Sequence, residues 1–402
     1  MKWRVKGLYK GPAVEIARAY RRCLGSVCVV GITGSCGKTS AKDFTAAVLS
    51  SRLSGRKSYD TTNGAYSVAR TLLATRPWHD FCVQEVGAFA PGNMDRPIAV
   101  LRATIGVITV IRDDHYSSFK GAEGVAREKR KLIDALPADG IAVLNMDDPY
   151  LREIARQSKA RVVGFGCAQD AHVRAEDVSA AYPGRLSFTV CRAGERARVG
   201  TRLLGEHQLP SVLAALAVGT AAGVPLTDAV RAVEACEPTP GRMELIADAD
   251  GVAFINDSYK APYWSLDAVF EFMRVARAAR KWIVLGKISH HRLKSRQLYR
   301  RVTERALACC DRVVFVGPST HHAADSGGRV DAFAHLREAD GFLRSELRRG
   351  DLVLVKGENI ANHAARLFLS RMQGVTCWRD DCGLAIDCRR CRMLARGSAS
   401  ST

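Results

Sequence analysis

A glycine-rich turn near the start of the chain carries residue types that bind phosphate. The segment GITGSCGKTS, residues 31–40, follows a short apolar run and precedes a stretch with helical periodicity. Backbone N–H groups of such a turn and the positive end of the next helix form an anion site, and a lysine there reaches the terminal phosphates of a nucleotide. The spacing departs from the strict Walker pattern G-x-x-x-x-G-K-S/T, because position 32 is isoleucine and the glycine stands one residue earlier. The residues predicted to bind the nucleotide are Gly34, Ser35, Gly37, Lys38, Thr39 and Ser40.

Ligands for a divalent metal are expected at the ends of two further apolar runs. DFCVQEVGA places Glu85 after its apolar residues, and VITVIRDDHYSSF places His115 after two aspartates. Open α/β sheets bind ligands at the carboxyl ends of their strands, so both side chains would approach the phosphates. There they and the Thr39 hydroxyl would hold Mg²⁺ between the nucleotide and an acceptor. The alternative is that Glu85 caps a helix and that His115 is a surface loop residue.

Strands and helices must hold these side chains in place, and the sequence indicates where they lie. From about residue 27 onward, strand-like apolar runs alternate with amphipathic stretches. Such alternation predicts an α/β protein with mostly parallel sheets and helices on both faces. We expect a P-loop-type central domain with a mostly parallel sheet, followed by a Rossmann-like C-terminal α/β domain. The predicted strands are Ser26–Ile32, Phe81–Val86, Ile105–Ile111, Ile141–Asn145, Arg161–Phe165, Val252–Asp257, Trp282–Gly286, Arg312–Val316 and Leu352–Val355.

The segment EPTPGRMELI, residues 237–246, marks the best domain boundary, because two prolines and a glycine interrupt a helical pattern before a new strand. We therefore predict an N-terminal arm, a nucleotide-binding domain, a second α/β domain and a cysteine-bearing tail. Their ranges are 1–25, 26–240, 241–372 and 373–402. The last eight residues, ARGSASST, are small and polar and are expected to be disordered.

The composition is that of a globular protein, with 47% hydrophobic and 25% charged residues among 402. The apolar stretches are far shorter than the ~20 residues that a membrane helix needs, and the first residues lack the apolar core of a secretory signal, so we expect a cytoplasmic protein without a membrane span. A net charge of +19 favours anionic partners such as nucleotides and acidic substrates. We do not expect nucleic acid as a partner, because we find no basic stretch interleaved with aromatic residues and no recognition module.

Four of the thirteen cysteines gather near the end of the chain in CWRDDCGLAIDCRRC. The spacing C-x4-C-x5-C-x2-C suits a structural zinc site that would fold a segment too short for a core. The alternatives are a redox-active dithiol and a disordered tail with incidental cysteines. The candidate zinc ligands are Cys377, Cys382, Cys388 and Cys391.

Several segments, in one order along the chain, resemble the Mur ligase family of ATP-dependent amide-forming enzymes. The resemblance runs from about residue 27 to 370, and its pattern is most similar to the branch that adds D-alanyl-D-alanine to a muramyl tripeptide. The segments are GITGSCGKTS, VQEVGAFAPGNM, VITVIRDDHYSSFKGAEGVAREKRKLIDALPADGIAVLNMDDP, GEHQLPSVLAALA, PTPGRMELI, INDSYKAPYWSL and LVLVKG.

The resemblance implies that ATP and Mg²⁺ are used to activate a carboxylate as an acyl phosphate, which an amine then attacks. Lys38 would grip the β- and γ-phosphates, and Thr39, Glu85 and His115 would bind Mg²⁺. Lys129 falls where the family carries a carbamylated lysine that supports a second Mg²⁺. By charge pattern alone, Lys129 belongs to a solvated helix face, because charged residues flank it on both sides.

The resemblance also assigns residues around the nucleotide. His207 and Asn145 are candidates for contact with the base or ribose. Arg242 and Asp257 would reach the nucleotide from the second domain once that domain closes over it, which would shield the acyl phosphate from water. Lys356 matches the closing motif of the family.

Departures from the family pattern concern the substrates. Lys260, Pro262 and Lys287 stand where the incoming amine would be handled, so the identity of the amine stays open. Only about 26 residues precede the first predicted strand, so we expect the N-terminal domain that binds a UDP-sugar to be absent and a partner protein to be able to supply it. The alternative to a ligase is a non-catalytic nucleotide-binding partner or regulatory subunit with the same fold.

Overall fold

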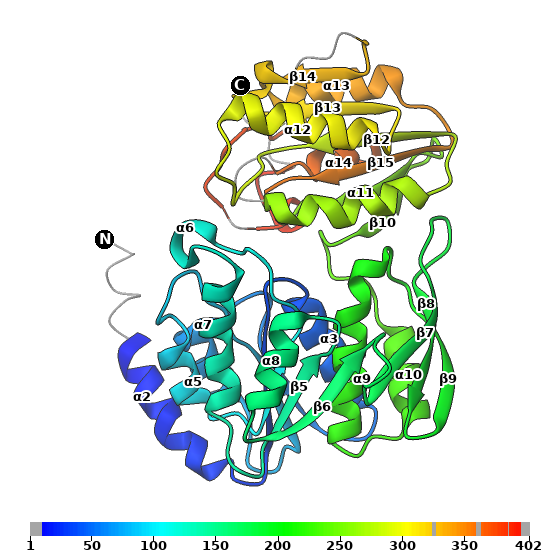
Figure 1. The fold of residues 1–402 in the computed structure, drawn as a ribbon. Coiled ribbons are helices and arrows are strands. Elements are labelled where there is room, and N and C mark those ends of the chain that lie inside the picture. Colours follow the sequence, from blue (N-terminus) through cyan, green and yellow to red (C-terminus); the bar gives the residue numbers. More distant parts are fainter. Residues whose placement is uncertain (1–9, 324–326, 359–362, 385, 395–402) are drawn as a thin grey trace. The chain divides into compact units, whose positions relative to one another are not determined.

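The computed structural model describes residues 10–323, 327–358, 363–384 and 386–394, and these divide into two compact units (Figure 1). The first unit comprises the described residues up to Ser179, together with Leu186–Arg202 and Glu206–Glu237. The second comprises Ala180–Arg185, Leu203–Gly205 and the described residues from Pro238 onward.

The first unit contains a nine-stranded sheet in the order β2-β3-β1-β4-β5-β6-β7-β8-β9. Neighbouring strands are parallel from β2 to β7, and β8 and β9 continue the sheet in antiparallel fashion. The strands are β1 (Cys28–Thr33), β2 (Gly55–Lys57), β3 (Phe81–Glu85), β4 (Ile105–Ile108), β5 (Ile141–Asn145), β6 (Arg161–Gly166), β7 (Val173–Ser179), β8 (Ser187–Arg192) and β9 (Glu195–Gly200).

Helices cover both faces of this sheet. The helices are α2 (Lys10–Tyr20), η1 (Arg21–Cys23), α3 (Lys38–Ser50), α4 (Ala65–Ala74), α5 (Asp95–Leu101), α6 (Tyr116–Phe119), α7 (Ala122–Asp134), α8 (Pro149–Gln157), η2 (Glu206–Gln208), α9 (Leu209–Ala221) and α10 (Leu226–Ala235). On one face of the sheet, Val29 of β1 packs in one cluster with Leu101 of α5 and Leu132 of α7. The alternate side chains of β1 point to the other face, where α3 contacts both β1 and α9.

The predicted N-terminal arm contributes to the core of the first unit. Helix α2 packs against α4 and α5, and its residues Val14 and Ala17 are buried. The buried guanidinium of Arg21 follows, and it donates hydrogen bonds to the carbonyl oxygens of Leu101, Leu24 and Arg102 at 2.8–3.0 Å. The first nine residues of the predicted arm lie outside the described residues.

The second unit is built on a six-stranded sheet in the order β10-β11-β15-β12-β13-β14, parallel except for the β10–β11 pair. Its strands are β10 (Glu244–Ala247), β11 (Ala253–Asp257), β12 (Arg280–Leu285), β13 (Arg312–Val316), β14 (Val330–Phe333) and β15 (Asp351–Lys356). Its helices are η3 (Tyr263–Ser265), α11 (Leu266–Val275), α12 (Ser295–Leu307), η4 (Thr320–His322), α13 (Leu336–Glu346), α14 (Arg366–Met372) and η5 (Cys388–Arg390).

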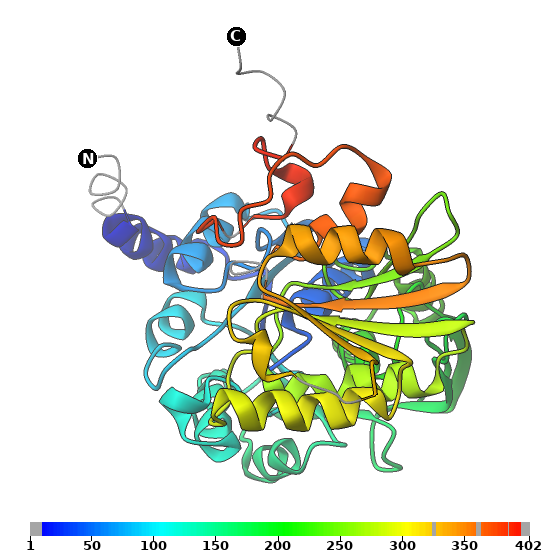
Figure 2. The same ribbon diagram turned by 90° about the horizontal axis from the view of Figure 1, so that it is seen from above.

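Two separate apolar clusters lie on the two faces of the second sheet. One joins alternate strand residues to α11 and α12, and the other joins the remaining strand residues to α13 and α14. Figure 2 shows the sheet between α12, in yellow, and α13, in orange. This arrangement of helices on both faces of a mostly parallel sheet is the Rossmann-like architecture that the sequence predicts.

The α/β fold class is confirmed, and each predicted strand has a counterpart in the two sheets. The sequence did not indicate the short strands β2, β10 and β14, nor the strands β7, β8 and β9. These are edge or half-exposed strands with charged residues, so they lack the continuous apolar run of a buried parallel strand. The four predicted domain ranges stay predictions. Within the described part of the chain, no helix has the length and apolar character needed to cross a membrane.

Candidate active site

The phosphate-binding turn lies between β1 and α3, as the sequence predicts. Gly37 has φ 75°, a conformation that side chains other than glycine's rarely adopt, and a Cβ there would lie 2.4 Å from the Ser211 hydroxyl. A Cβ on Gly34 would lie 2.0 Å from the Thr109 hydroxyl oxygen. The two glycines therefore let the turn pass close to α9 and to the segment after β4.

The start of α3 offers free backbone donors to an anion. The first hydrogen bond of the helix runs from Ala41 N–H to the Gly37 carbonyl oxygen at 2.8 Å, so the N–H groups of residues 38–40 precede the helical ladder. The Lys38 ammonium bends over the turn and donates to the Gly34 carbonyl oxygen at 2.7 Å. Donors, a helix N-terminus and an ammonium group at one turn fit the phosphates of ATP.

Of the two serines of the predicted nucleotide site, Ser35 has hydrogen bonds within the protein and Ser40 is buried. Ser35 donates its N–H to Val110 O at 2.8 Å, and its hydroxyl accepts the N–H of Arg112 at 2.9 Å. These bonds tie the turn to the segment that follows β4. Ser40 is buried within α3, at 3% exposure, one residue beyond Thr39.

Glu85, at the end of β3, lies beside Thr39. The Thr39 hydroxyl donates to Glu85 Oε2 at 2.8 Å, and Asn63 Nδ2 donates to Glu85 Oε1 at 3.0 Å. A carboxylate and a hydroxyl oxygen next to a phosphate-binding turn are the donor set that Mg²⁺ prefers. The interpretation of Glu85 as a helix cap is wrong, because both of its carboxylate oxygens accept these side-chain bonds.

Asn63 is a site residue that sequence reasoning missed. It lies in the loop before α4, and its carbonyl oxygen also accepts the N–H of Gly87 at 3.2 Å. A Cβ at Gly87 would come within 2.6 Å of the Asn63 amide, so this glycine lets the two loops meet. The only sequence signal was a short polar run ahead of a helix, which is equally typical of an N-cap.

Lys129 is buried on α7, with 2% of its surface exposed, so the interpretation as a solvated helix face is wrong. Burial, with the nearby Lys38 ammonium, lowers the pKa of its amine from 10.5 to about 7, against the attraction of Asp114, Glu128 and Glu85. A large fraction of this amine is therefore neutral near pH 7. The same interactions place Lys38, Lys129 and Glu85 in one electrostatic neighbourhood.

His115 stands at the start of α6 with φ 48°, and its ring lies against Phe89 at a centroid distance of 6.0 Å. Its Nε2 is 3.7 Å from an oxygen of the buried Asp114, which interacts with Lys129. The imidazole therefore lies next to the carboxylate and lysine cluster. This position suits a metal ligand better than the alternative of a surface loop residue.

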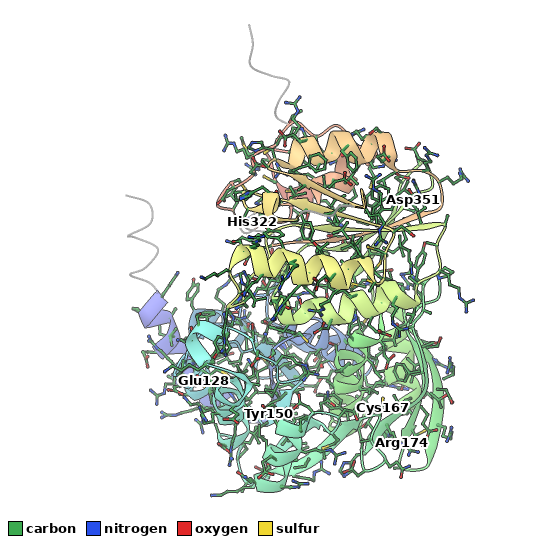
Figure 3. The ribbon with its side chains drawn as sticks, turned by 45° about the horizontal axis from the view of Figure 1, so that its top comes forward. Glu128, Tyr150, Cys167, Arg174, His322 and Asp351 are labelled. Atoms are coloured by element: carbon green, nitrogen blue, oxygen red, sulfur yellow. The ribbon has the colours of Figure 1, made fainter. Side chains whose placement is uncertain are left out.

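Glu128, which is labelled in Figure 3, is a second residue that the sequence analysis missed. It belongs to the charged run around Lys129. Its carboxylate accepts the N–H groups of Gly92 at 3.0 Å and Met94 at 2.9 Å, and it pairs with Lys131 at 2.9 Å. Burial opposes ionisation, but these hydrogen bonds and the Lys131 charge keep the pKa of Glu128 below its usual value. Glu128 thus ties the loop of residues 87–94 to α7, next to Lys129.

The two residues expected near the base differ in their surroundings. Asn145 is buried, and its amide donates to Thr109 O at 3.0 Å and accepts the N–H of Asp147 at 3.0 Å, so it braces the ends of β4 and β5. His207 lies in η2, directly before α9, whose Ser211 hydroxyl contacts the Gly37 carbonyl oxygen at 3.3 Å. Contact of either residue with a nucleotide stays a prediction.

Arg242 and Asp257 belong to the second unit. The Arg242 guanidinium lies over the Tyr259 ring, 4.6 Å from its centroid, and Asp257 ends β11 in an ion pair with Lys356 at the end of β15. Their approach to the nucleotide stays a prediction. Lys356 is buried at 4% exposure and has a structural role in this pair.

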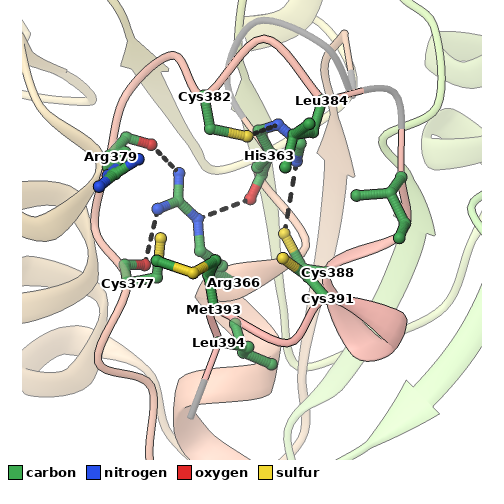
Figure 4. Close-up of a pocket in the computed structure, with 11 residues that line it drawn as sticks. His363, Arg366, Cys377, Arg379, Cys382, Leu384, Cys388, Cys391, Met393 and Leu394 are labelled. Carbon is green, nitrogen blue, oxygen red and sulfur yellow. Dashed lines mark hydrogen bonds between the residues drawn. The ribbon is translucent and has the colours of Figure 1, made fainter. Parts of the chain in front are cut away.

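The four C-terminal cysteines line one cavity of the second unit, together with His363 (Figure 4). The alternative of a disordered tail is wrong for this segment, which contains η5 and packs Cys388 and Leu394 into the core. His363 was missed, because it lies fourteen residues before the first of these cysteines. The predicted disorder of the last eight residues falls outside the described residues.

Comparison with known proteins agrees with this geometry. Residues 32–219 match the family model of the Mur ligase middle domain, and residues 241–359 match that of the Mur ligase glutamate ligase domain. UDP-N-acetylmuramoyl-tripeptide–D-alanyl-D-alanine ligase of Mycobacterium tuberculosis (strain CDC 1551 / Oshkosh) is 30% identical over 85% of this chain and 72% of its own length. The enzyme of the same name from Escherichia coli (strain K12) is 29% identical over 76% of this chain and 68% of its own length.

Solved structures lead to the same family. A MurF crystal structure from Acinetobacter baumannii superposes with a TM-score of 0.80 at 25% identity, over 90% of this chain and 80% of that one. MurF ligase from Thermotoga maritima, solved in complex with ADP, shares the fold with a TM-score of 0.77 at 22% identity, over 90% of this chain and 82% of that one. These matches support the ligase interpretation and not the alternative of a non-catalytic partner subunit. The chain therefore belongs to the Mur ligase family, and it is an ATP-dependent ligase that joins a carboxylate to an amine.

Proposed function

We propose that the first unit binds Mg-ATP at the turn of residues 34–40 and activates a substrate carboxylate there. The observation that supports this most strongly is the hydrogen bond between Thr39 and Glu85, because it sets two oxygen ligands beside the phosphate-binding turn. Thr39, Glu85, His115 and a carbamylated Lys129 would hold Mg²⁺. The metal would offset the negative charge of the triphosphate and of the incoming carboxylate.

The residues of the chain then have distinct roles. Lys38 leaves its carbonyl partner in the turn and donates to the γ-phosphate, where charge grows as the carboxylate oxygen attacks phosphorus. ADP departs, and the acyl phosphate stays in the site until the amine attacks its carbonyl carbon and phosphate leaves. Arg242 and Asp257 would act from the second unit, with closure excluding water during this interval.

Lys129 becomes a metal ligand only after a change of charge. Its neutral amine would attack CO₂ and lose a proton, which gives a carbamate anion in place of a cation. Burial supports this proposal, because the charged ammonium is disfavoured at 2% exposure and has Lys38 as a neighbour. The carbamate would also relieve the repulsion between two lysines at one site.

The relatives indicate the class of the carboxylate substrate, and two lysines of this chain bear on the amine. We propose that the carboxylate belongs to a peptide of the cell-wall precursor type, since the relatives act on UDP-N-acetylmuramoyl-tripeptide. The amine would be one that Lys260 and Lys287 can accommodate, which makes an amine carrying its own carboxylate the best candidate. Such precursors and ATP are cytoplasmic, so we propose that the enzyme acts in the cytoplasm.

A partner protein is part of this proposal. The matched region spans 72% of the length of the Mycobacterium tuberculosis relative, so part of that enzyme has no counterpart in the alignment. We propose that a separate polypeptide presents the carboxylate substrate to the first unit. Co-purification from cells that make the substrate, followed by reconstitution of turnover from the two purified proteins, tests this point.

The reaction class is tested by trapping the intermediate. Incubation with Mg-ATP, hydroxylamine and a panel of peptide carboxylates should yield a hydroxamate and ADP with a suitable acid. Glu85→Gln should abolish hydroxamate formation, whereas Glu153→Gln, on an exposed face of α8, should leave it unchanged. Hydroxamate formation by Glu85→Gln at the wild-type rate would contradict the assignment of the metal site.

A further inference from the structure

The C-terminal segment of residues 375–394 forms part of the second unit. Cys388 and Leu394 belong to the apolar cluster on the α13 and α14 face of the sheet, and Val375 and Trp378 pack against that cluster. The segment is closed by two hydrogen bonds to the Leu394 carbonyl oxygen, from the Thr376 N–H at 3.1 Å and the Thr376 hydroxyl at 2.9 Å. Its cysteines are therefore held at defined places.

Sulfur and imidazole groups line the cavity under this segment. All four of its cysteines line the cavity, and His363 reaches into it from the segment before α14 (Figure 4). The buried ring of His363 lies between two thiols, with Nε2 3.0 Å from Cys382 Sγ and Nδ1 3.4 Å from Cys388 Sγ. A thiol is a weak hydrogen-bond partner, so this ring gains little from either contact.

Cys388 and Cys391 form the second half of the arrangement. They flank η5, where Asp387 accepts the Arg389 N–H at 2.9 Å and Cys391 donates its N–H to the Cys388 carbonyl oxygen at 3.0 Å. Figure 4 shows their sulfur atoms next to each other on the side of His363. A Cys-x-x-Cys turn of this kind commonly supplies two ligands to one metal ion.

Cys377 lies apart from the other three cysteines. In Figure 4 it stands across the Arg366 side chain from His363. The buried Arg366 guanidinium donates to the carbonyl oxygens of Cys377 at 2.7 Å and Arg379 at 2.6 Å, and to that of His363 at 3.3 Å. Arg366 thus holds both sides of the cavity in place and separates Cys377 from the imidazole.

We propose that His363, Cys382, Cys388 and Cys391 bind one zinc ion, and that this ion fastens the C-terminal segment to the second unit. Cys377 is not a ligand, which differs from the four-cysteine site that the spacing alone predicts. The site lies outside the two matched family regions, which end at residue 359, so it is independent of the proposed ligase mechanism.

Charge supports this ligand set. Three thiolates and a neutral imidazole around Zn²⁺ carry a net charge of −1, which the buried Arg366 guanidinium would offset. Metals bind imidazole in its neutral form and cysteine as thiolate, so zinc binding to this ligand set releases the thiol protons.

Binding requires small movements of side chains. Among the described residues, no three ligand atoms of this cavity lie within 4.8 Å of one another. A tetrahedral site with Zn–S distances of about 2.3 Å and a Zn–N distance of about 2.0 Å needs its ligands closer than that. We expect the Cys382 and His363 side chains to turn toward the Cys388–Cys391 pair when zinc binds.

Metal analysis of the full-length protein, purified without chelators, tests the proposal. We expect about one zinc per chain in the wild type and in Cys377→Ser. The variants Cys382→Ser, Cys388→Ser and His363→Gln should each lose most of it. Loss of zinc from Cys377→Ser to the same extent would overturn this ligand set, and a wild type that binds no zinc would overturn the site.

Cobalt substitution gives a readout that does not depend on the stability of a variant. The wild type, stripped of metal and loaded with Co²⁺, should show the intense visible bands of a tetrahedral ion and a sulfur-to-cobalt charge-transfer band of three thiolates. Thiol titration should find three fewer reactive cysteines after loading. A band of four thiolates, or a Cys388–Cys391 disulfide in place of metal, would refute the proposal.

Discussion

Replacement of Lys129 by methionine should stabilise the first unit and abolish ligase activity at the same time. Methionine keeps the length and apolar stem of the lysine side chain but removes an amine that is buried at 2% exposure. Wild-type stability is reduced by that amine, because folding lowers its pKa from 10.5 to about 7. Activity should disappear, since the proposed carbamate cannot form.

The size and sign of the effect follow from the pKa change. Between pH 7 and 10.5 the unfolded chain binds a proton at Lys129 that the folded chain does not, so wild-type stability rises with pH across this range. The unfavourable contribution of Lys129 amounts to about 4 kcal/mol at pH 7 and about 2 kcal/mol at pH 9. Lys129→Met should therefore be more stable than the wild type by these amounts.

Thermal unfolding in CO₂-depleted buffer measures this difference. For a unit of this size each kcal/mol changes Tm by about 2–4 °C, so we expect a gain of about 10 °C at pH 7 and about half of that at pH 9. Lys159→Met, at an exposed position, is the matched control and should change stability by less than about 0.5 kcal/mol. A Lys129→Met variant no more stable than the wild type at pH 7, or a gain that does not fall with pH, would refute the reasoning.

Two further substitutions test how the site is held together. Glu128→Gln should destabilise the first unit by about 1–3 kcal/mol and lower kcat, because the loop of residues 87–94 loses the carboxylate that accepts its two N–H groups. An unchanged free energy of unfolding and an unchanged kcat would show that other contacts hold the loop. Gly37→Ala should raise the KM for ATP about tenfold or more, since alanine is strained at φ 75° and its Cβ meets the Ser211 hydroxyl. Adding Ser211→Ala should recover only the part due to the contact, and full recovery would mean that backbone strain plays no role.

The sequence by itself determined the phosphate-binding turn, the α/β class and most of the parallel strands. These features are local, because a turn that needs glycine at a positive φ, a helix start and an apolar run of five residues are each written in consecutive positions. The order of the motifs along the chain also identified the family before any contact between them was known.

Only the tertiary structure decided which distant residues meet. Thr39 and Glu85 are 46 positions apart, and their hydrogen bond depends on β3 lying next to β1 in the sheet. Lys129 lies in a run of charged residues that predicts a solvent-exposed helix face. It is buried because it lies on the face of α7 that packs against the rest of the first unit. His363 and Cys382 meet because the C-terminal segment folds back over α14. Such contacts arise from packing between elements, and no local pattern of residue types encodes them.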